Sequence, residues 1–415
     1  MSPLAHEMRL LVRARLAAAA LLLLALLAAA GVAAGIAEVR HQRAVIERIG
    51  PQQQSDVDAI AEWVDKIGDP GSAAYYTFHP TWDAPSPLAF AALGMRDVAP
   101  YILRVRALGL EAQLYDGENF NPELALPGRF DFAFVLVYLA PLFMIALFHD
   151  MKSSEREAGR LTMLRALPGA GGLWRRRVAL RFALAYAALA IPFGVGAVLS
   201  GVAALPLVGV LALVVAYLAF WAVLAMFIGS RGWSSVTNAA ALAACWLVLT
   251  LVLPTLAHVV INRAVPVAQG VELTLAQREA VNRAWDIPRE ATMERFLANH
   301  PEWRDTQPLP PAFHWKWYFA FHQVGDESVA DKVRAYRTGL ETRDTAARTI
   351  GWALPGVGVQ TVLTRMAGTD LRAQLAYQDR IRAFHGQLRR FYYGYLFNDR
   401  PFRAADFAKA PKFEP

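Results

Sequence analysis

The stretch FALAYAALAIPFGVGAVLSGVAALPLVGVLALVVAYLAFWAVLAMFIG, residues 182–229, holds 48 consecutive residues without a charged side chain. A helix that crosses about 30 Å of hydrocarbon needs roughly 20 mainly apolar residues. The stretch is too long for one such helix and long enough for two, and Gly201–Pro206 contains residues that favour a turn. It therefore predicts two transmembrane helices joined by a short connection.

Three more apolar segments flank this pair: Leu16–Ile36, Phe132–Phe148 and Thr237–Ile261. Each is expected to form one span, so the predicted fold class is an all-α integral membrane protein with about five transmembrane helices. The two long polar segments are expected to form mainly helical extracytoplasmic regions. The predicted division of the chain is 1–36, 37–131, 132–148, 149–181, 182–229, 230–261 and 262–415.

The composition agrees with a membrane protein, because 19% of the residues are charged against about 25% in soluble domains. The net charge of +7 can indicate nucleic acid or an anionic membrane surface. The densest basic cluster lies between two apolar blocks, so we expect membrane lipid and no nucleic acid as a partner. Cys245 is the only cysteine, which excludes an intramolecular disulfide. A cleaved signal peptide is an alternative for the first apolar segment, since Ala28–Ala30 resembles a cleavage site.

Three prolines, Pro141, Pro192 and Pro254, lie inside the expected spans. A proline lacks the N–H that would bond the carbonyl four residues earlier, so each should kink its helix. In hydrocarbon the freed carbonyl needs another donor. We therefore expect neighbouring helices to supply these donors.

The polar segments show weaker patterns. Loops are predicted at 52–54, 68–71, 80–87 and around the prolines at 308–311, and helices at 89–111, 274–299 and 326–347. Thr349–Thr364 is uncharged but only 16 residues long. It is expected to rest on the membrane or to pack against the spans, with a sixth span as the alternative.

Two aromatic runs, Trp315–Phe321 and Phe391–Phe397, are interpreted as anchors at the membrane interface. His314 and His322 flank the first run and lie eight residues apart. This is not the spacing of two metal ligands on one helix face, so no metal site is predicted.

Basic residues near the spans predict the orientation. The segment 149–181 carries eight, namely Lys152, Arg156, Arg160, Arg165, Arg175, Arg176, Arg177 and Arg181. This short loop and the N-terminus are therefore expected to be cytoplasmic, and the C-terminus to lie on the outer side. Arg175, Arg176 and Arg177 are expected to anchor the following span at the membrane surface.

The same loop, DMKSSEREAGRLTMLRALPGAGGLWRRRVALRF, residues 150–182, predicts one short amphipathic helix at the inner surface. Ser153 and Ser154 are expected to cap a helix that begins at Glu155. Leucines 161, 164 and 167 form its apolar stripe, and Gly169–Gly172 ends it. Such a helix offers a surface that a soluble motor protein can bind.

The pattern E-R-E-x-G-R-L-x-x-L-R-A-x-P in this loop resembles the signature of ABC-2 type exporter permeases. In that family, a carboxylate-led helix after the second span meets the ATPase subunit. The resemblance implies an ATPase-coupling element whose residues here are Glu155, Arg156, Glu157, Gly159, Leu161, Leu164 and Pro168.

Three further motifs resemble a bacterial subgroup of these permeases: R-D-x-x-P at 96–100, N-P-E-L-A-L-x-G-R-F-D-F at 121–132 and A-G-T-D at 367–370. The resemblance implies a permease in the bacterial inner membrane, with a periplasmic C-terminus. It also implies a second permease, identical or a sister subunit, and cytoplasmic ABC ATPase subunits that hold the ATP and Mg²⁺. Permeases of this type usually have six spans, whereas five are predicted here.

Other function classes have less support. The chain lacks G-x-x-x-x-G-K-[ST], H-E-x-x-H and G-x-S-x-G, so we expect neither ATP hydrolysis nor another enzyme activity in this chain, and no cofactor bound to it. The predicted spans contain no acidic residue, which disfavours an ion-coupled transporter. The alternative that stays open is a membrane-anchored scaffold or sensor with extracytoplasmic domains. The sequence specifies no substrate.

Overall fold

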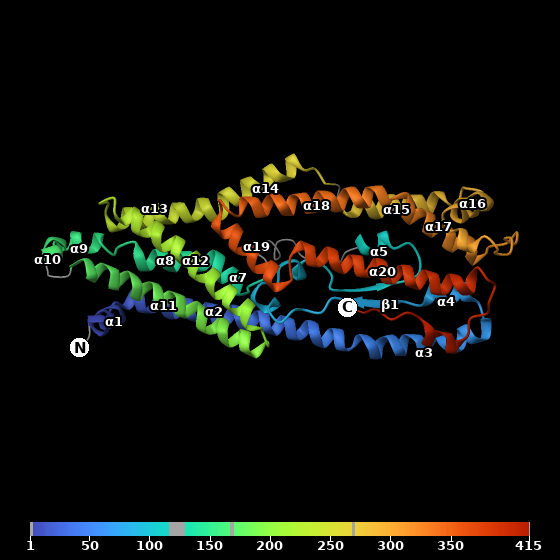
Figure 1. Cartoon of the computed structure of the whole chain (residues 1–415), viewed down its shortest axis with the longest axis horizontal. Helices are drawn as coiled ribbons and strands as arrows, with labels where there is room; N and C mark the ends of the chain where they lie inside the picture. Colours follow the sequence, from blue (N-terminus) through green and yellow to red (C-terminus); the bar gives the residue numbers. More distant parts are fainter. Residues whose placement is uncertain (1–2, 116–128, 167–169, 268–269, 415) are drawn as a thin grey trace.

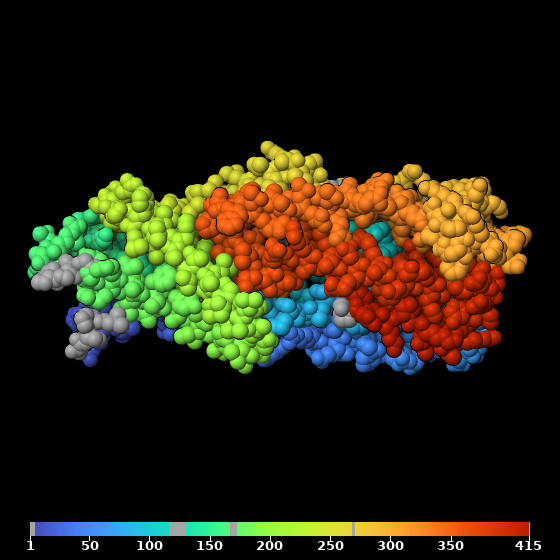
Figure 2. Space-filling model, viewed as in Figure 1, coloured from blue at the N-terminus to red at the C-terminus, as the bar shows by residue number. Residues whose placement is uncertain are grey.

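The molecule is a long rod with two unlike halves, shown in Figures 1 and 2. A computed structural model describes residues 3–115, 129–166, 170–267 and 270–414. One half is a bundle of apolar helices, with the N-terminus at its free end. The other half, which we call the distal domain, contains both long polar segments of the chain.

Five helices in the described residues are long and apolar enough to cross a membrane, as the sequence predicts. We call the half that holds them the apolar bundle. Its elements are α1 (Pro3–Arg13), α2 (Arg15–Glu47), α7 (Phe132–Phe134), the π-helical turn η3 (Val135–Leu139), α8 (Ala140–Phe148), α11 (Ala170–Leu199), α12 (Ala204–Gly229), α13 (Ser235–Leu247), the π-helical turn η4 (Val248–Val252) and α14 (Leu253–Ala264).

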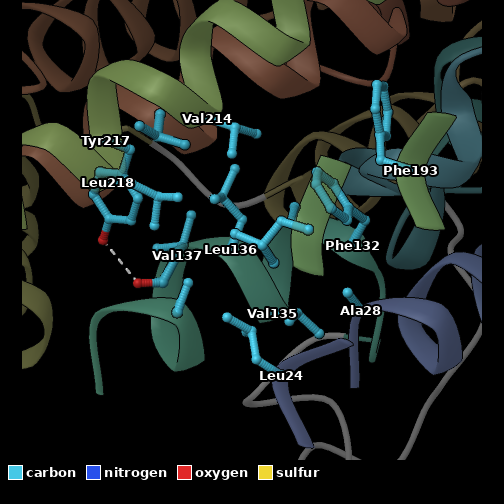
Figure 3. Packing of buried hydrophobic residues seen from close by; sticks show 14 of the residues in the cluster. Leu24, Ala28, Phe132, Val135, Leu136, Val137, Phe193, Val214, Tyr217 and Leu218 are labelled. Atoms are coloured by element: carbon cyan, nitrogen blue, oxygen red, sulfur yellow. Dashed lines mark hydrogen bonds between the residues drawn. The ribbon is translucent and has the colours of Figure 1, made fainter. Parts of the chain in front are cut away.

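The core of the bundle is built around the second span, where Leu136 and its neighbours pack between α2, α11 and α12 (Figure 3). Pro141 leaves the carbonyl of Val137 without its usual helical donor. The hydroxyl of Tyr217 on α12 donates to that carbonyl at 2.8 Å. The expectation that a neighbouring helix supplies the missing donor is therefore confirmed at this proline.

Two glycines of α2 let the chain backbone come unusually close. A Cβ on Gly35 would lie 2.0 Å from the carbonyl oxygen of Phe90, and one on Gly31 would lie 2.7 Å from that of Asp131. Small residues four apart are a common device for close backbone packing between membrane helices. Here the device seats the short turn η1 (Ala89–Ala91) against α2.

The distal domain joins the two polar segments around one hydrophobic core. Val64 and Val105 from the first segment share a buried cluster with Phe296, Phe319 and Tyr392 from the second. The first contributes α3 (Ile49–Ile67), α4 (Pro70–Tyr76), β1 (His79–Trp82), η2 (Gly94–Asp97), β2 (Ile102–Val105) and α5 (Glu111–Tyr115). The second contributes α15 (Gly270–Arg283), α16 (Arg289–Asn299), η5 (Pro301–Trp303), α17 (Trp315–Ser328), α18 (Ala330–Ile350), α20 (Leu371–Leu396) and η6 (Ala404–Lys409).

Several local predictions for the polar segments are wrong. The fold is not all-α, because β1 and β2 form an antiparallel sheet in which His79 pairs with Val105. Residues 89–111 form short turns and β2 instead of a helix, and residues 52–54 lie inside α3. Each residue of β1 pairs with a residue 20 to 26 positions later in the chain, from Trp82 with Ile102 to His79 with Val105, and local helical spacing cannot detect such a partner.

The aromatic runs are core residues of the distal domain and not interfacial anchors. Trp317, Phe319 and Phe321 from the first run are buried, as are Tyr392 and Phe397 from the second. Their rings pack against neighbouring rings, so their apolar surface is buried inside the protein. The interpretation as membrane anchors is therefore wrong for these side chains.

The segment 349–364 is divided between the end of α18 and a separate helix, α19 (Pro355–Ala367). With 13 residues, α19 is about 20 Å long, shorter than the hydrocarbon layer. Its buried residues Val359 and Leu363 belong to the core of the apolar bundle. The structure therefore places this segment against the spans, which is one of the two arrangements expected for it.

Candidate coupling site at the bundle end

Two short helices, α9 (Ser153–Glu157) and α10 (Leu161–Ala166), follow α8 at the free end of the bundle (Figure 1). The prediction of one continuous helix is wrong, because Gly159 adopts the left-handed conformation with φ of 69° and separates them. The predicted cap is also wrong: Lys152 precedes the first turn, and the Ser154 hydroxyl donates to the Asp150 carbonyl at 2.6 Å.

Glu155 ties α9 to two other helices. Its carboxylate accepts from Arg160 Nε at 2.8 Å and from Arg177 Nη1 on α11 at 2.9 Å. Arg177 Nε in turn donates to Glu7 of α1 at 3.1 Å. The Glu155, Arg177 and Glu7 side chains are each at most 16% exposed. Because the charges are largely withdrawn from water, breaking one contact leaves its partner poorly compensated.

Glu157 ties α9 to the fifth apolar helix. Its carboxylate accepts from the Ser235 backbone N–H at 2.7 Å and from the Ser235 hydroxyl at 2.9 Å. Ser235 is the first residue of α13, where unpaired N–H groups and the helix dipole favour a negative charge. Arg156 strengthens the same junction by donating to the Trp233 carbonyl, just before α13.

The outer surface of this end is formed by α10. Met163 is 61% exposed, and Leu161 and Leu164 are half-buried. A Cβ on Gly159 would meet only open space. Pro168, the last residue of the predicted coupling element, lies outside the described residues. The motif thus has an inward part on α9 and an outward part on α10.

The three arginines predicted to anchor α11 differ in their surroundings. Arg175 and Arg176 are exposed. Arg177 points to the carboxylates of Glu7 and Glu155 and also lies 5.4 Å from the centre of the Trp174 ring. The charge of Arg177 is therefore paired within the protein, whereas Arg175 and Arg176 are accessible to a surface partner or to lipid.

Sequence reasoning missed three contributors to this site: Glu7, Ser235 and Asn238. Asn238 Nδ2 donates to the His149 carbonyl at 3.2 Å, which fixes the end of α8 against α13. A usable signal existed for two of them. Glu7 is the only acid before residue 38, and Ser234–Ser235 directly precede an apolar run, as helix-capping residues do.

A second constellation lies where the bundle meets the distal domain, and we call it the clamp. Arg96 Nε donates to Gln42 of α2 at 2.8 Å, and its Nη1 contacts Asp83 at 2.5 Å. Burial lowers the pKa of the Arg96 guanidinium, and the neighbouring Asp83 carboxylate opposes that shift. Asp97 pairs with Arg129 at 2.6 Å. Residues 96 and 97 of the R-D-x-x-P motif therefore connect α2 with the loops beyond it.

The A-G-T-D motif completes the clamp from the other side. The Thr369 hydroxyl donates to the Ala92 carbonyl at 2.7 Å, and the Met95 N–H donates to the Thr369 carbonyl at 2.7 Å. Asp370 caps α20 by accepting from the Ala373 N–H. The A-G-T-D motif thus bonds to the residues just before the R-D-x-x-P motif, about 270 positions earlier in the chain. Residues 121–128 of the remaining motif lie outside the described residues.

A metal centre has no support in the described part of the chain, where no group of three or more His, Cys, Asp or Glu residues could hold an ion. His314 caps α17 by accepting from the Lys316 N–H at 3.2 Å. His322 lies farther along the same helix, beside the Gly109 N–H. The two histidines do not converge.

The comparisons with known proteins give one family-model match, which covers about a third of the chain. No curated protein and no solved structure matches the chain significantly. Residues 271–415 match the family described as "Domain of unknown function (DUF3526)". The matched region begins within α15 and contains α16 to α20, so the similarity covers the second polar segment and leaves most of the apolar bundle outside it.

Proposed function

We propose that this chain is the membrane-spanning permease subunit of an ATP-driven exporter of the ABC-2 type. In this proposal the apolar bundle crosses the bacterial inner membrane, and α9 and α10 face the cytoplasm. A separate ABC ATPase subunit binds ATP and Mg²⁺, and this chain carries out no covalent chemistry. The distal domain lies on the periplasmic side.

The observation that carries the proposal is the double attachment of α9. Glu155 connects α9 to α11 and α1, and Glu157 connects it to the first turn of α13. A force applied to the outward helix α10 therefore reaches several spans through short polar contacts. A partner can shift the spans between two states only if it contacts the two states differently, and this junction is a place where such contacts can act.

The arrangement of the ends supports the proposed orientation. Both polar segments that were expected outside the membrane fold together at one end of the rod. The N-terminus and the basic loop, expected inside, share the opposite end. The resulting charge distribution follows the positive-inside rule.

A second permease as partner is supported by the fifth span. In the apolar window of Ser235–Ala264, 6% of the residues are buried, against 61% in Phe132–Glu157. Lipid can cover such a surface, and so can another copy of the chain or a sister subunit. The exposed His258, hydrogen-bonded to Asn262, lies on this helix and favours a partner protein because polar side chains are costly against lipid.

The alternative function, a membrane-anchored scaffold or sensor, is favoured by a different observation. A large share of the described chain forms the distal domain, which has its own core and its own clefts. A sensor would require that domain and tolerate changes on α10. The permease proposal predicts instead that changes on α10 impair function, whereas changes on the surface of the distal domain are tolerated.

The test uses two substitutions that are matched in chemistry and exposure. Met163→Glu places a carboxylate on α10, where the side chain is 61% exposed, and Leu275→Glu does the same on α15, at 59% exposure. The full-length chain would be captured from native membranes in mild detergent, and the co-purifying proteins identified by mass spectrometry. Wild type and Leu275→Glu should recover an ABC ATPase subunit.

Met163→Glu should reduce that recovery about tenfold or more, which corresponds to a loss of about 1.4 kcal/mol at a central contact. ATP turnover of the recovered complex would be measured in parallel. The proposal fails if no ATPase subunit is recovered with wild type under several conditions. It also fails if Met163→Glu matches Leu275→Glu in both recovery and turnover.

A further inference from the structure

We propose that a cleft in the distal domain binds an uncharged, mainly apolar small molecule that carries an aromatic ring. The cleft has a volume of about 540 Å³ and is bounded by α3, β1, α20 and the C-terminal segment, residues 404–413. Figure 1 shows that segment, in red, running between β1 and α3. The volume falls within the range of about 300–1,000 Å³ typical of small-molecule sites.

Aromatic side chains form one wall of the cleft. Phe413 contacts Trp82 edge-to-face, with ring centres 5.4 Å apart, and contacts Phe384 in the same way at 5.5 Å. Val57 and Ala61 of α3 also line the cleft and are only half-buried. A ligand ring can therefore continue the edge-to-face packing of the aromatic wall and cover the aliphatic side chains.

The charges around the cleft favour a neutral ligand. The lining has one formal negative charge, on Asp58, and one positive charge, on Lys412, and both residues are exposed. His79 is buried, with Nε2 2.9 Å from the Tyr392 hydroxyl, and burial lowers its pKa to about 4. The imidazole is thus neutral near pH 7. A charged ligand would gain no net attraction here and would lose its hydration.

Lipid does not explain this apolar surface. The cleft begins at Ile49, which lies 13 residues beyond Ile36 (49−36) and so about 20 Å farther along the helical path. The helix α3 also carries Asp56, Asp58 and Glu62, and these carboxylates require water around the helix. The exposed apolar residues of the bundle fit a hydrocarbon environment, whereas these residues fit a ligand. The inference does not depend on the proposed transport function.

The experiment measures protection of a cysteine in the cleft of the full-length protein in lipid nanodiscs. Gln53→Cys, in a Cys245→Ala background, places a thiol on the cleft wall. Its reaction rate with a charged, water-soluble thiol reagent is followed while the uncharged dye N-phenylnaphthylamine is titrated. At a free dye concentration about ten times Kd, the rate should fall about elevenfold, because only the unliganded fraction reacts.

Four variants separate the cleft from non-specific effects. Ala61→Trp fills the cleft from α3, and Ala59→Trp adds the same side chain two residues away, beside a different groove. Ala59→Trp should retain protection and Ala61→Trp should lose it. Asp331→Cys, an exposed reporter on α18, should show no protection at any dye concentration. Val57→Phe is a smaller filling change if the tryptophan impairs folding.

Saturable protection at position 53 that is lost in the filled variants supports the proposal. The proposal is overturned if position 53 shows no saturable protection up to the solubility limit of the dye. It is equally overturned if protection persists unchanged in folded Ala61→Trp and Val57→Phe, or appears to the same extent at position 331. The first result would mean that the cleft does not bind the dye, and either of the other two would assign the protection to lipid or to the reagent.

Discussion

Replacing Asp326 by alanine should loosen the junction between the two polar segments of the chain. Asp326 lies on α17 and accepts from Arg389 Nη2 of α20 at 2.7 Å. It also accepts from the backbone N–H groups of Leu110 at 2.8 Å and Glu111 at 3.4 Å, which belong to the other polar segment. Burial raises the pKa of Asp326, and the Arg389 guanidinium opposes that shift.

The magnitude follows from the burial of both charges. The Asp326 and Arg389 side chains are 11% and 10% exposed, so water screens them little. Removing one partner of such a pair costs about 3–5 kcal/mol, because the other charge stays buried without compensation. Since about 1.4 kcal/mol corresponds to a factor of ten in an equilibrium constant, local opening should increase by about two to three and a half orders of magnitude.

Hydrogen exchange of the full-length protein in nanodiscs, followed by mass spectrometry, measures this opening directly. Amides of α17 and α20 should exchange about two to three and a half orders of magnitude faster in Asp326→Ala, while amides of α12 in the bundle should not change. The double variant Asp326→Leu/Arg389→Met replaces the pair by apolar side chains. It should recover most of the loss, because neither residue then leaves a buried charge.

The reasoning is refuted if Asp326→Ala leaves exchange in α17 and α20 at the wild-type rate. It is also refuted if the double variant exchanges as fast as the single one. The first result would mean that the pair is not buried in solution. The second would mean that packing around Asp326, and not the unpaired charge, determines the stability of the junction.

Three further outcomes are expected from substitutions elsewhere. Gly35→Val should lower the thermal midpoint strongly, because its Cβ would collide with a backbone carbonyl, whereas Gly50→Val, in open space, should leave the midpoint nearly unchanged. Tyr217→Phe should destabilise the bundle by about 1 kcal/mol in a denaturant titration, since a carbonyl freed by proline loses its donor; an unchanged midpoint would contradict this role. The carboxylate of Glu327 raises the pKa of His300 above 6.5, so the protonated imidazole stabilises the fold below that pH and the contribution is lost as pH rises through the folded-state pKa. His300→Gln should therefore lower the thermal midpoint at about pH 5.5 and hardly at about pH 8.5, and an equal effect at both would exclude titration as the cause.

The spans could be predicted from the sequence because their signal is local. A run such as Phe182–Gly229 must be buried in some apolar phase, and its length alone requires two helices. The extension of the first span into α3 could not be predicted. Gln52–Gln54 has the composition of a loop, and it is helical because neighbouring residues of α3, such as Val57 and Ala61, pack against the distal core.

The candidate coupling site shows a similar limit. The residue types of the motif were evident, but their partners lie far away in the chain: Ser235 is 78 residues after Glu157, and Glu7 is 170 residues before Arg177. When these partners are not known, the carboxylates of Glu155 and Glu157 are expected to be free to bind another protein. The structure shows that they hold helices together, so a charge reversal at Glu157 would disturb α13 as well as any external contact.

In the described residues, packed elements connect the two ends of the rod. Glu155 holds Arg177 near the start of α11, and α11 packs along α2 in the core of the bundle. The helix α2 then continues to Glu47, and the clamp holds its Gln42 through Arg96. Packed helices shift as bodies, because a close-packed interior resists continuous deformation. Under the proposed permease function, we therefore predict that a displacement of α11 at the bundle end is passed along α2 to the clamp, where the distal domain begins.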